Sequence, residues 1–259
     1  MCGIFGFALK KHIPLARVLN VLEKLEAHQY PSEPKPVGGY GAGVAILDDD
    51  RSIVLEKVGK VDVSPARRLS EIVKIDEASV LMGHVRMPSP EFIGTAKAKA
   101  TAQPYVAECI SGLTVVSVHN GKVENYEEIR RKLANRHLLE SEQVGLIDSE
   151  VVPHFFEEKL QNRAGSDALS AFFEDLSGSN AIGLLQVEKE GALLHLVHKG
   201  KTRGLTVWTN DRGEVVFCSR KEPLMAEFKS VLAEDRFEEK VSVPWNVEKS
   251  LKLSFAVEM

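Results

Sequence analysis

The amino-acid sequence predicts an α+β protein in which antiparallel sheets are covered by helices. Strand and helix signals come in clusters rather than in strict alternation, which argues against a doubly wound parallel sheet. The sequence contains neither a G-x-G-x-x-G fingerprint nor a P-loop lysine motif, so it does not indicate a nucleotide-binding fold. In the last third, short apolar segments separated by turns predict a meander with strands near 180–187, 192–198, 205–209 and 214–219.

The first part of the chain begins with a short apolar run that predicts a buried strand over residues 3–8. Apolar residues then recur at helical spacing and predict an amphipathic helix over 13–27. A segment rich in proline and glycine, 31–43, is expected to be a loop. Two apolar runs, 44–47 and 53–55, flank three aspartates and predict a hairpin.

The middle of the chain combines helices and strands around one ordered loop. A helix through 66–73 leads to a strand over 79–84, and the prolines and small residues of 87–104 predict an ordered loop. A β-branched run predicts a strand over 113–118 that ends at 119–121. Further helices are expected in three places: one with Tyr126, Ile129 and Leu133 on one face, one beginning near Asp148, and one over about 166–175.

The composition is that of an ordinary globular protein, and we expect a single domain over residues 1–259. The net charge of −4 gives no electrostatic reason to expect nucleic acid or an anionic membrane as a partner. The apolar stretches are too short to span a bilayer, and no secretory signal is recognisable. The three cysteines are widely spaced and form neither a disulfide framework nor a metal-binding motif, so we expect a cytoplasmic protein without a metal or cofactor.

Cys2 is the most informative single residue because of its position. If Met1 is removed, Cys2 carries a thiol nucleophile and a free α-amine that can accept the thiol proton. The alternative is a buried structural cysteine at the start of the first strand.

Two further candidates stand at predicted strand ends. Asn120-Gly121 offers a side-chain amide and a backbone N–H that together can form an oxyanion hole, although Asn-Gly is also a common hairpin turn. Arg86 can bind a carboxylate through two parallel hydrogen bonds, or it can be a solvated surface arginine.

Asp148 and two histidines complete the candidate site. Asp148 can bind a substrate ammonium group, and aspartate is equally a preferred N-cap of the helix expected there. His84 and His119 flank the motifs and can carry protons, whereas the ordinary role of such residues is that of hydrogen-bonded core histidines.

Six short motifs, taken in order, resemble the class II glutamine amidotransferase domain of the N-terminal-nucleophile hydrolase superfamily. They are Met1-Cys2-Gly3-Ile4, Tyr40-Gly41-Ala42-Gly43-Val44-Ala45, Gly83-His84-Val85-Arg86, Val118-His119-Asn120-Gly121-Lys122-Val123-Glu124-Asn125-Tyr126, Asp148-Ser149-Glu150-Val151 and Phe217-Cys218-Ser219-Arg220-Lys221-Glu222-Pro223-Leu224. The resemblance covers about residues 2–225 and leaves 226–259 as a C-terminal extension. It implies a four-layer α/β/β/α sandwich of two antiparallel sheets.

The resemblance also implies a role for each candidate residue. Cys2 would be the nucleophile and its amine the base, while Asn120 and the Gly121 N–H would form the oxyanion hole. Arg86 would hold the α-carboxylate of L-glutamine and Asp148 its α-ammonium group.

One segment departs from the family pattern. Many members carry an aromatic residue and then Ala/Ser-Thr after the clamp arginine, where this chain has Met87-Pro88-Ser89-Pro90. Ser89 is expected to supply the threonine-like hydroxyl to the substrate, while the two prolines remove backbone donors. This departure puts the choice of substrate in question.

The resemblance implies a glutaminase subunit that forms a γ-glutamyl thioester on Cys2. Similar synthases continue into a synthase domain that is not recognisable here, so the ammonia is expected to pass to a separate synthase partner. Two alternatives stay open: a free-standing amidase for another γ-glutamyl compound, and a regulatory, glutamine-binding subunit with weak catalysis.

Overall fold

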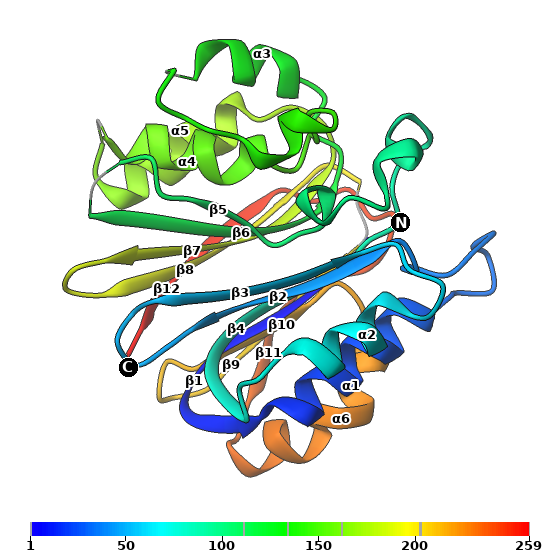
Figure 1. Ribbon diagram of the computed structural model, residues 1–259. Coiled ribbons are helices and arrows are strands. Elements are labelled where there is room, and N and C mark those ends of the chain that lie inside the picture. Colours follow the sequence, from blue (N-terminus) through cyan, green and yellow to red (C-terminus); the bar gives the residue numbers. More distant parts are fainter. Residues whose placement is uncertain (1, 111, 134, 162, 202–203, 259) are drawn as a thin grey trace.

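The chain folds into two antiparallel β-sheets packed face to face, with helices on both outer surfaces (Figure 1). The computed structural model describes residues 2–110, 112–133, 135–161, 163–201 and 204–258. All strand pairs between the named strands are antiparallel in this described part. The predicted α+β class and the four-layer α/β/β/α sandwich are therefore confirmed.

The larger sheet has seven strands in the order β11-β9-β10-β1-β4-β2-β3. Their bounds are β1 Gly3–Pro14, β2 Gly41–Leu47, β3 Ile53–Gly59, β4 Glu77–Val85, β9 Leu205–Thr209, β10 Val215–Cys218 and β11 Glu238–Val243. The first strand pairs with β4 on one side and β10 on the other, so the chain start lies inside the sheet rather than at its edge.

The smaller sheet has five strands in the order β12-β8-β7-β6-β5. Their bounds are β5 Tyr105–Ala107, β6 Leu113–Gly121, β7 Asn180–Glu188, β8 Ala192–Lys199 and β12 Leu251–Val257. The segment 226–259, expected as an extension, thus contributes the edge strand β11 to one sheet and the edge strand β12 to the other.

Helices α1 (Leu15–Ala27), α2 (Pro65–Ile72) and α6 (Lys221–Glu234) cover the seven-stranded sheet, and α3 (Tyr126–Lys132), α4 (Val151–Gln161) and α5 (Gly165–Asp175) cover the five-stranded sheet (Figure 1). Short 3₁₀ helices, η1 (Pro90–Thr95), η2 (Lys99–Thr101) and η3 (Glu140–Gln143), lie in the connections. No helix in the described part of the chain is both long and apolar enough to cross a membrane.

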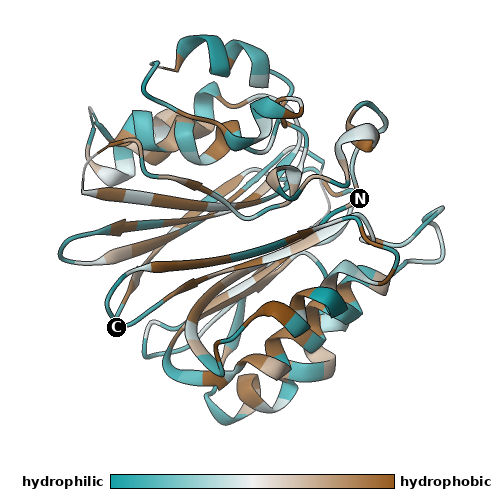
Figure 2. Cartoon of the chain, viewed as in Figure 1, coloured by the Kyte–Doolittle hydropathy of each residue, from teal (hydrophilic) through white to brown (hydrophobic). Residues whose placement is uncertain are grey.

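Three hydrophobic cores hold the layers together. One lies under α1, α2 and α6, a second under α3, α4 and α5, and a third between the sheets. Figure 2 shows hydrophobic residues concentrated in the strands, while the outer helices alternate between hydrophobic and hydrophilic positions. Burial of these side chains is the main favourable contribution to the free energy of folding.

Most predicted elements are confirmed, but the meander is wrong, and the loop expected over 87–104 contains the 3₁₀ helices η1 and η2. The helix expected over 13–27 is α1, and the hairpin expected around three aspartates is β2–β3, with Leu47 opposite Ile53. The first strand runs to Pro14 rather than residue 8. The predicted four-stranded meander does not form, because β7 and β8 pair in the small sheet while β9 and β10 pair in the large one.

Candidate active site

Cys2 lies directly before β1, at the end of the space between the two sheets. Side chains alternate along a strand, and Ile4 and Ala8 point into the core between the sheets, so Cys2 belongs to the same face. Its Sγ atom lies 3.4 Å from both the backbone nitrogen and the carbonyl oxygen of Met87. The residue is half-buried rather than enclosed in the core.

Ser219 fixes the backbone at Ile4, two residues after Cys2. Its hydroxyl oxygen accepts a hydrogen bond from the Ile4 N–H at 3.0 Å, and its own N–H donates to the Ile4 carbonyl at 2.9 Å. The motif after β10 therefore extends its pairing with β1 to Ile4, two residues after Cys2. We did not single out Ser219 from the sequence, although it lies in one of the quoted motifs.

Arg86 follows β4 and is 3% exposed, so it is not a solvated surface arginine. Its Nη1 donates to the hydroxyl of Thr101 at 2.6 Å and its Nη2 to that of Thr95 at 3.1 Å. Burial lowers the pKa of the guanidinium, and the electrostatic influence of Tyr105, Cys2 and Asp148 opposes that shift. Arg86 therefore lies near Tyr105, Cys2 and Asp148.

Asn120 and Gly121 are the last two residues of β6, where they pair with Ala181 and Asn180 of β7. They do not form the hairpin turn that Asn-Gly could have indicated. Asn120 is 1% exposed, and strand alternation puts it on the same face as Val118, which lies in the core between the sheets.

Gly121 permits a close approach of the neighbouring chain. A Cβ atom at this position would lie 2.1 Å from the carbonyl oxygen of Ser179. Real Cβ atoms do not approach an oxygen so closely, so only glycine fits without a backbone shift.

Gln103 holds the strand just before Asn120. Its side-chain Oε1 accepts from the His119 N–H at 2.7 Å, and its Nε2 donates to the His119 carbonyl at 3.0 Å. Gly43 makes room for this segment, because a Cβ there would lie 2.3 Å from the Gln103 carbonyl oxygen. This contact gives a physical reason for Gly43 in the motif around residues 40–45.

Asp148 is tied to the end of β6. Its Oδ2 accepts from the Val123 N–H at 3.0 Å, and helix α4 begins three residues later, at Val151. The neighbouring Ser149 hydroxyl lies 2.7 Å from Nδ1 of His119, whose Nε2 lies 2.9 Å from the Asn180 Oδ1. Because Asn180 Oδ1 can only accept, Nε2 carries the hydrogen and Nδ1 accepts from Ser149.

The two flanking histidines differ. His119 is hydrogen-bonded through both ring nitrogens, as expected of a core histidine, and burial lowers its pKa. His84 is fully buried, and neither ring nitrogen has a hydrogen-bond partner among the described residues. Burial, with Arg86 nearby, lowers the pKa of His84 well below its usual range, so the ring is neutral.

Ser89 lies in the departing segment, half-buried, directly before η1. Its carbonyl oxygen accepts from the Phe92 N–H at 3.0 Å. The hydroxyls that contact Arg86 belong instead to Thr95 and Thr101, two residues that we did not single out from the sequence.

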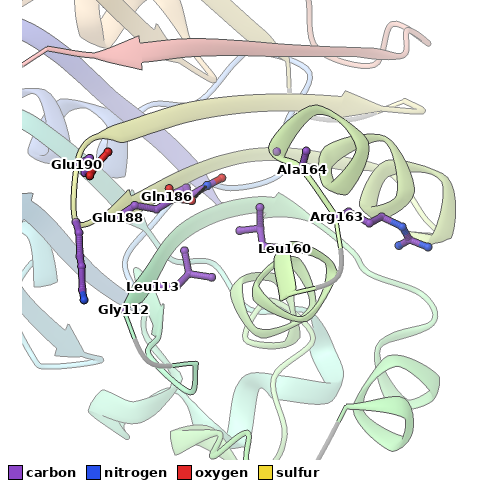
Figure 3. A pocket seen from close by; sticks show the side chains of 10 residues that line it. Gly112, Leu113, Leu160, Arg163, Ala164, Gln186, Glu188 and Glu190 are labelled. Atoms are coloured by element: carbon purple, nitrogen blue, oxygen red, sulfur yellow. Dashed lines mark hydrogen bonds between the residues drawn. The ribbon is translucent and has the colours of Figure 1, made fainter.

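A hollow of about 560 Å³ lies at the opposite end of the small sheet (Figure 3). Its lining includes Leu113 at the start of β6 and Glu188 at the end of β7. At about 3.3 Å per residue, Leu113 is roughly 23 Å along the strand from Asn120. This hollow is therefore separate from the candidate site.

Comparison with known proteins agrees with this arrangement. The family described as a glutamine amidotransferase domain matches residues 92–226, which is more than half of the chain. The chain belongs to the class II glutamine amidotransferase family. The matched segment contains Asn120, Gly121 and Asp148, while Cys2, Arg86 and Ser89 precede it.

Two curated relatives of this amidotransferase domain are glutamine–fructose-6-phosphate aminotransferases. The protein from Pyrobaculum aerophilum is 33% identical over 201 residues, covering 74% of this chain and 29% of the relative. The protein from Bacillus thuringiensis subsp. konkukian is 31% identical over 222 residues, covering 83% and 32%. The chain thus spans about a third of the length of these relatives.

A solved structure supports the fold. Glutamine phosphoribosylpyrophosphate amidotransferase from B. subtilis matches with a TM-score of 0.62 at 17% sequence identity, covering 100% of this chain and 50% of that one. The two-sheet sandwich is therefore shared with a known amidotransferase.

Proposed function

We propose that this chain hydrolyses L-glutamine to glutamate and ammonia through a γ-glutamyl thioester on Cys2. The Cys2 sulfur attacks the side-chain amide carbon, while its α-amine, freed by removal of Met1, takes the thiol proton. The carbonyl electron pair moves onto the oxygen, which Asn120 and the Gly121 N–H stabilise. The C–N bond then breaks, the amine returns its proton to the leaving ammonia, and water later cleaves the thioester.

The substrate ends would be held by two charged groups of opposite sign. Arg86 binds the α-carboxylate, and the hydroxyls of Thr95 and Thr101 orient its guanidinium. Asp148 binds the α-ammonium group, and the Ser89 hydroxyl contacts the γ-glutamyl group. These roles follow from the family resemblance and from the chemistry of each side chain.

One observation carries the proposal. The Cys2 thiol contacts the backbone of Met87, and the guanidinium of the adjacent Arg86 lies near both Cys2 and Asp148. Asp148 in turn accepts a hydrogen bond from Val123, two residues after Gly121. Four separate motifs are thus brought close together.

The ammonia is proposed to pass to a synthase on a separate partner subunit. The curated relatives are named as aminotransferases of fructose 6-phosphate, and this chain aligns with about a third of each. The remaining two thirds of those proteins offer a precedent for combining a glutaminase-like domain with other sequence.

The test uses protein with a native N-terminus whose intact mass confirms the loss of Met1. Ammonia release from glutamine is compared between the wild type, Cys2→Ala and Cys218→Ala. We expect Cys2→Ala to lose at least about 10³-fold in rate, as for removal of other catalytic nucleophiles. Cys218, buried on the helix-covered face of the large sheet, serves as the control thiol and should retain activity.

The other outcomes of this assay would contradict the proposal or favour one of the two alternative functions. No ammonia from the wild type of confirmed mass, with or without a partner, would contradict the proposal. Faster cleavage of other γ-glutamyl amides would favour a free-standing amidase. The Met87-Pro88-Ser89-Pro90 segment is the reason to test such substrates, because it departs from the family pattern. Glutamine binding without turnover would indicate a regulatory subunit.

A further inference from the structure

Four side chains with metal-binding atoms meet on the outer side of the small sheet. Cys109 follows β5, His137 lies between α3 and η3, and His154 and Glu157 lie one turn apart on α4. One donor atom from each residue lies within 4.8 Å of those of all the others. His137, His154 and Glu157 are buried, while Cys109 is half-buried and leaves a route from solvent.

Three of the six distances between donor atoms of this Cys-His-His-Glu cluster suit one tetrahedral ion, and all six are within 4.8 Å. Cys109 Sγ lies 3.5 Å from His154 Nδ1, the two histidine Nδ1 atoms are 3.3 Å apart, and His137 Nδ1 lies 3.4 Å from Glu157 Oε2. Zinc bonds of about 2.0–2.3 Å to nitrogen, oxygen and sulfur give tetrahedral edges of roughly 3.3–3.6 Å. All three distances agree with such edges.

Hydrogen bonds around the cluster orient two of its donor atoms, His137 Nδ1 and Glu157 Oε2. His137 Nε2 lies 2.8 Å from Glu158 Oε2, so it can donate its hydrogen there and leave the Nδ1 lone pair facing the cluster. The Ile110 N–H donates to Glu157 Oε1 at 2.6 Å, which leaves Oε2 directed at His137. Carboxylate–histidine pairs of this kind are typical outer partners of zinc ligands.

His154 presents a donor atom to the same point. Its Nδ1 faces both the Cys109 sulfur and the Nδ1 of His137. With the His137 hydrogen on Nε2, the His137 Nδ1 also presents a lone pair there. One cation would bind both nitrogen atoms at once.

We propose that Cys109, His137, His154 and Glu157 bind one Zn²⁺-type divalent ion. The ion would form bonds to Sγ, the two Nδ1 atoms and Oε2, and the Cys109 thiol proton would leave to solvent. The thiolate and the carboxylate would neutralise the charge of the ion, which suits a buried position. Four protein ligands leave no open coordination position, so the site would be structural.

Such an ion would tie together three segments that the sequence separates. The β5–β6 connection, the segment after α3 and helix α4 would be held at one point, and α4 begins three residues after Asp148. This site is separate from the proposed glutaminase chemistry and does not depend on it.

The experiment uses untagged full-length protein freed of metal by a chelator and titrated with Co²⁺. Because the Cys2 thiol and amine could themselves chelate cobalt, the titration is done on Cys2→Ala and on Cys2→Ala/Cys109→Ser. We expect the first to bind one Co²⁺ per chain with visible d–d bands of a tetrahedral site and a sulfur-to-cobalt charge-transfer band, both displaced by Zn²⁺. The second should lose the charge-transfer band.

Thermal unfolding gives a second readout. Zn²⁺ should raise the Tm of Cys2→Ala and leave that of Cys2→Ala/Glu157→Gln nearly unchanged. Absence of cobalt bands in folded Cys2→Ala protein, or the same bands in both titrated proteins, would overturn the proposal. If Cys109→Ser does not fold, the charge-transfer band of Cys2→Ala decides, because the remaining thiol, Cys218, is 1% exposed in another core.

Discussion

The hydroxyl oxygen of Ser149 lies 2.7 Å from Nδ1 of His119, and both side chains are buried. His119 immediately precedes Asn120, and Ser149 immediately follows Asp148. One buried hydrogen bond therefore connects the strand that carries the proposed oxyanion hole with the loop that carries the proposed ammonium-binding carboxylate.

Replacement of Ser149 by alanine should loosen this connection. A lost hydrogen bond is worth about 1 kcal/mol, so we expect the KM for glutamine to rise by roughly five- to tenfold with a smaller change in kcat. Steady-state ammonia release measures both constants. Ser149→Thr keeps the hydroxyl and should restore most of the affinity; equal KM values for the alanine variant and the wild type would contradict this role.

Replacement of Gly121 by alanine should disturb the end of β6. The new Cβ would meet the Ser179 carbonyl oxygen at 2.1 Å, so the backbone must move. Overpacking of this kind costs about 1–3 kcal/mol, which urea unfolding can measure. Gly191→Ala is the matched control, because no atom lies within 4 Å of its Cβ position. Equal stability of the two variants would show that the end of β6 shifts to accommodate the added methyl group without a measurable loss of stability.

The sequence predicted those helices, strands and hairpins that depend on residues close together in the chain. The hairpin β2–β3 has its turn residues and both strands within 41–59. The separation of β8 from β9 was missed, since the pairing partners of β9 are β10 and β11 and no local pattern reports which sheet a strand joins. β11 and β12 were missed because both are partly exposed edge strands without a continuous apolar run.

The candidate site likewise contains residues that the sequence predicted and residues that it did not. The motifs around Cys2, Arg86, Asn120 and Asp148 are readable as short patterns, and their catalytic roles remain predictions. The residues that position them, such as Gln103 and Ser219, act through tertiary hydrogen bonds that no spacing reveals. For the Cys-His-His-Glu cluster, the one local signal was the helical spacing of His154 and Glu157.

A buried ion pair joins the loop after α1 to the start of α6. Glu33 and Arg220 have fully buried side chains, with Arg220 Nη1 2.9 Å from Glu33 Oε2 and Nη2 2.5 Å from Oε1. Glu33→Gln should cost about 3–5 kcal/mol of unfolding free energy, because it leaves the arginine charge buried without a counterion.

A double-mutant cycle tests this interpretation of the Glu33–Arg220 pair. Glu33→Leu/Arg220→Leu should be less destabilised than the sum of the single variants, since neither charge is left behind. The exposed pair Lys221–Glu239 is the comparison, and Glu239→Gln should cost at most about 1 kcal/mol. Similar costs for Glu33→Gln and Glu239→Gln would contradict the assignment.

Glu150, next to Ser149, should make the stability of the fold depend on pH. Its side chain is buried, and its carboxyl oxygens accept from the N–H groups of Glu140 at 2.6 Å and Ser141 at 2.9 Å. Burial raises the pKa of Glu150 to about 7 despite these hydrogen bonds. The folded chain therefore holds a proton on this group at pH values where the unfolded chain, with an ordinary glutamate pKa of about 4.3, has released it.

The sign of the effect follows from this difference in bound protons. The contribution of Glu150 is fully present below about pH 4.3 and falls as pH rises to about 7, by up to about 4 kcal/mol. Glu150→Gln cannot ionise and should lack this fall, apart from a constant offset of about 1 kcal/mol for one lost hydrogen bond. Urea unfolding of both proteins at several pH values between 4.5 and 8 measures the difference. Glu190→Gln, at the exposed turn between β7 and β8, controls for the loss of one charge. Parallel stability curves for wild type and Glu150→Gln would show that the buried carboxyl does not hold its proton in the folded state.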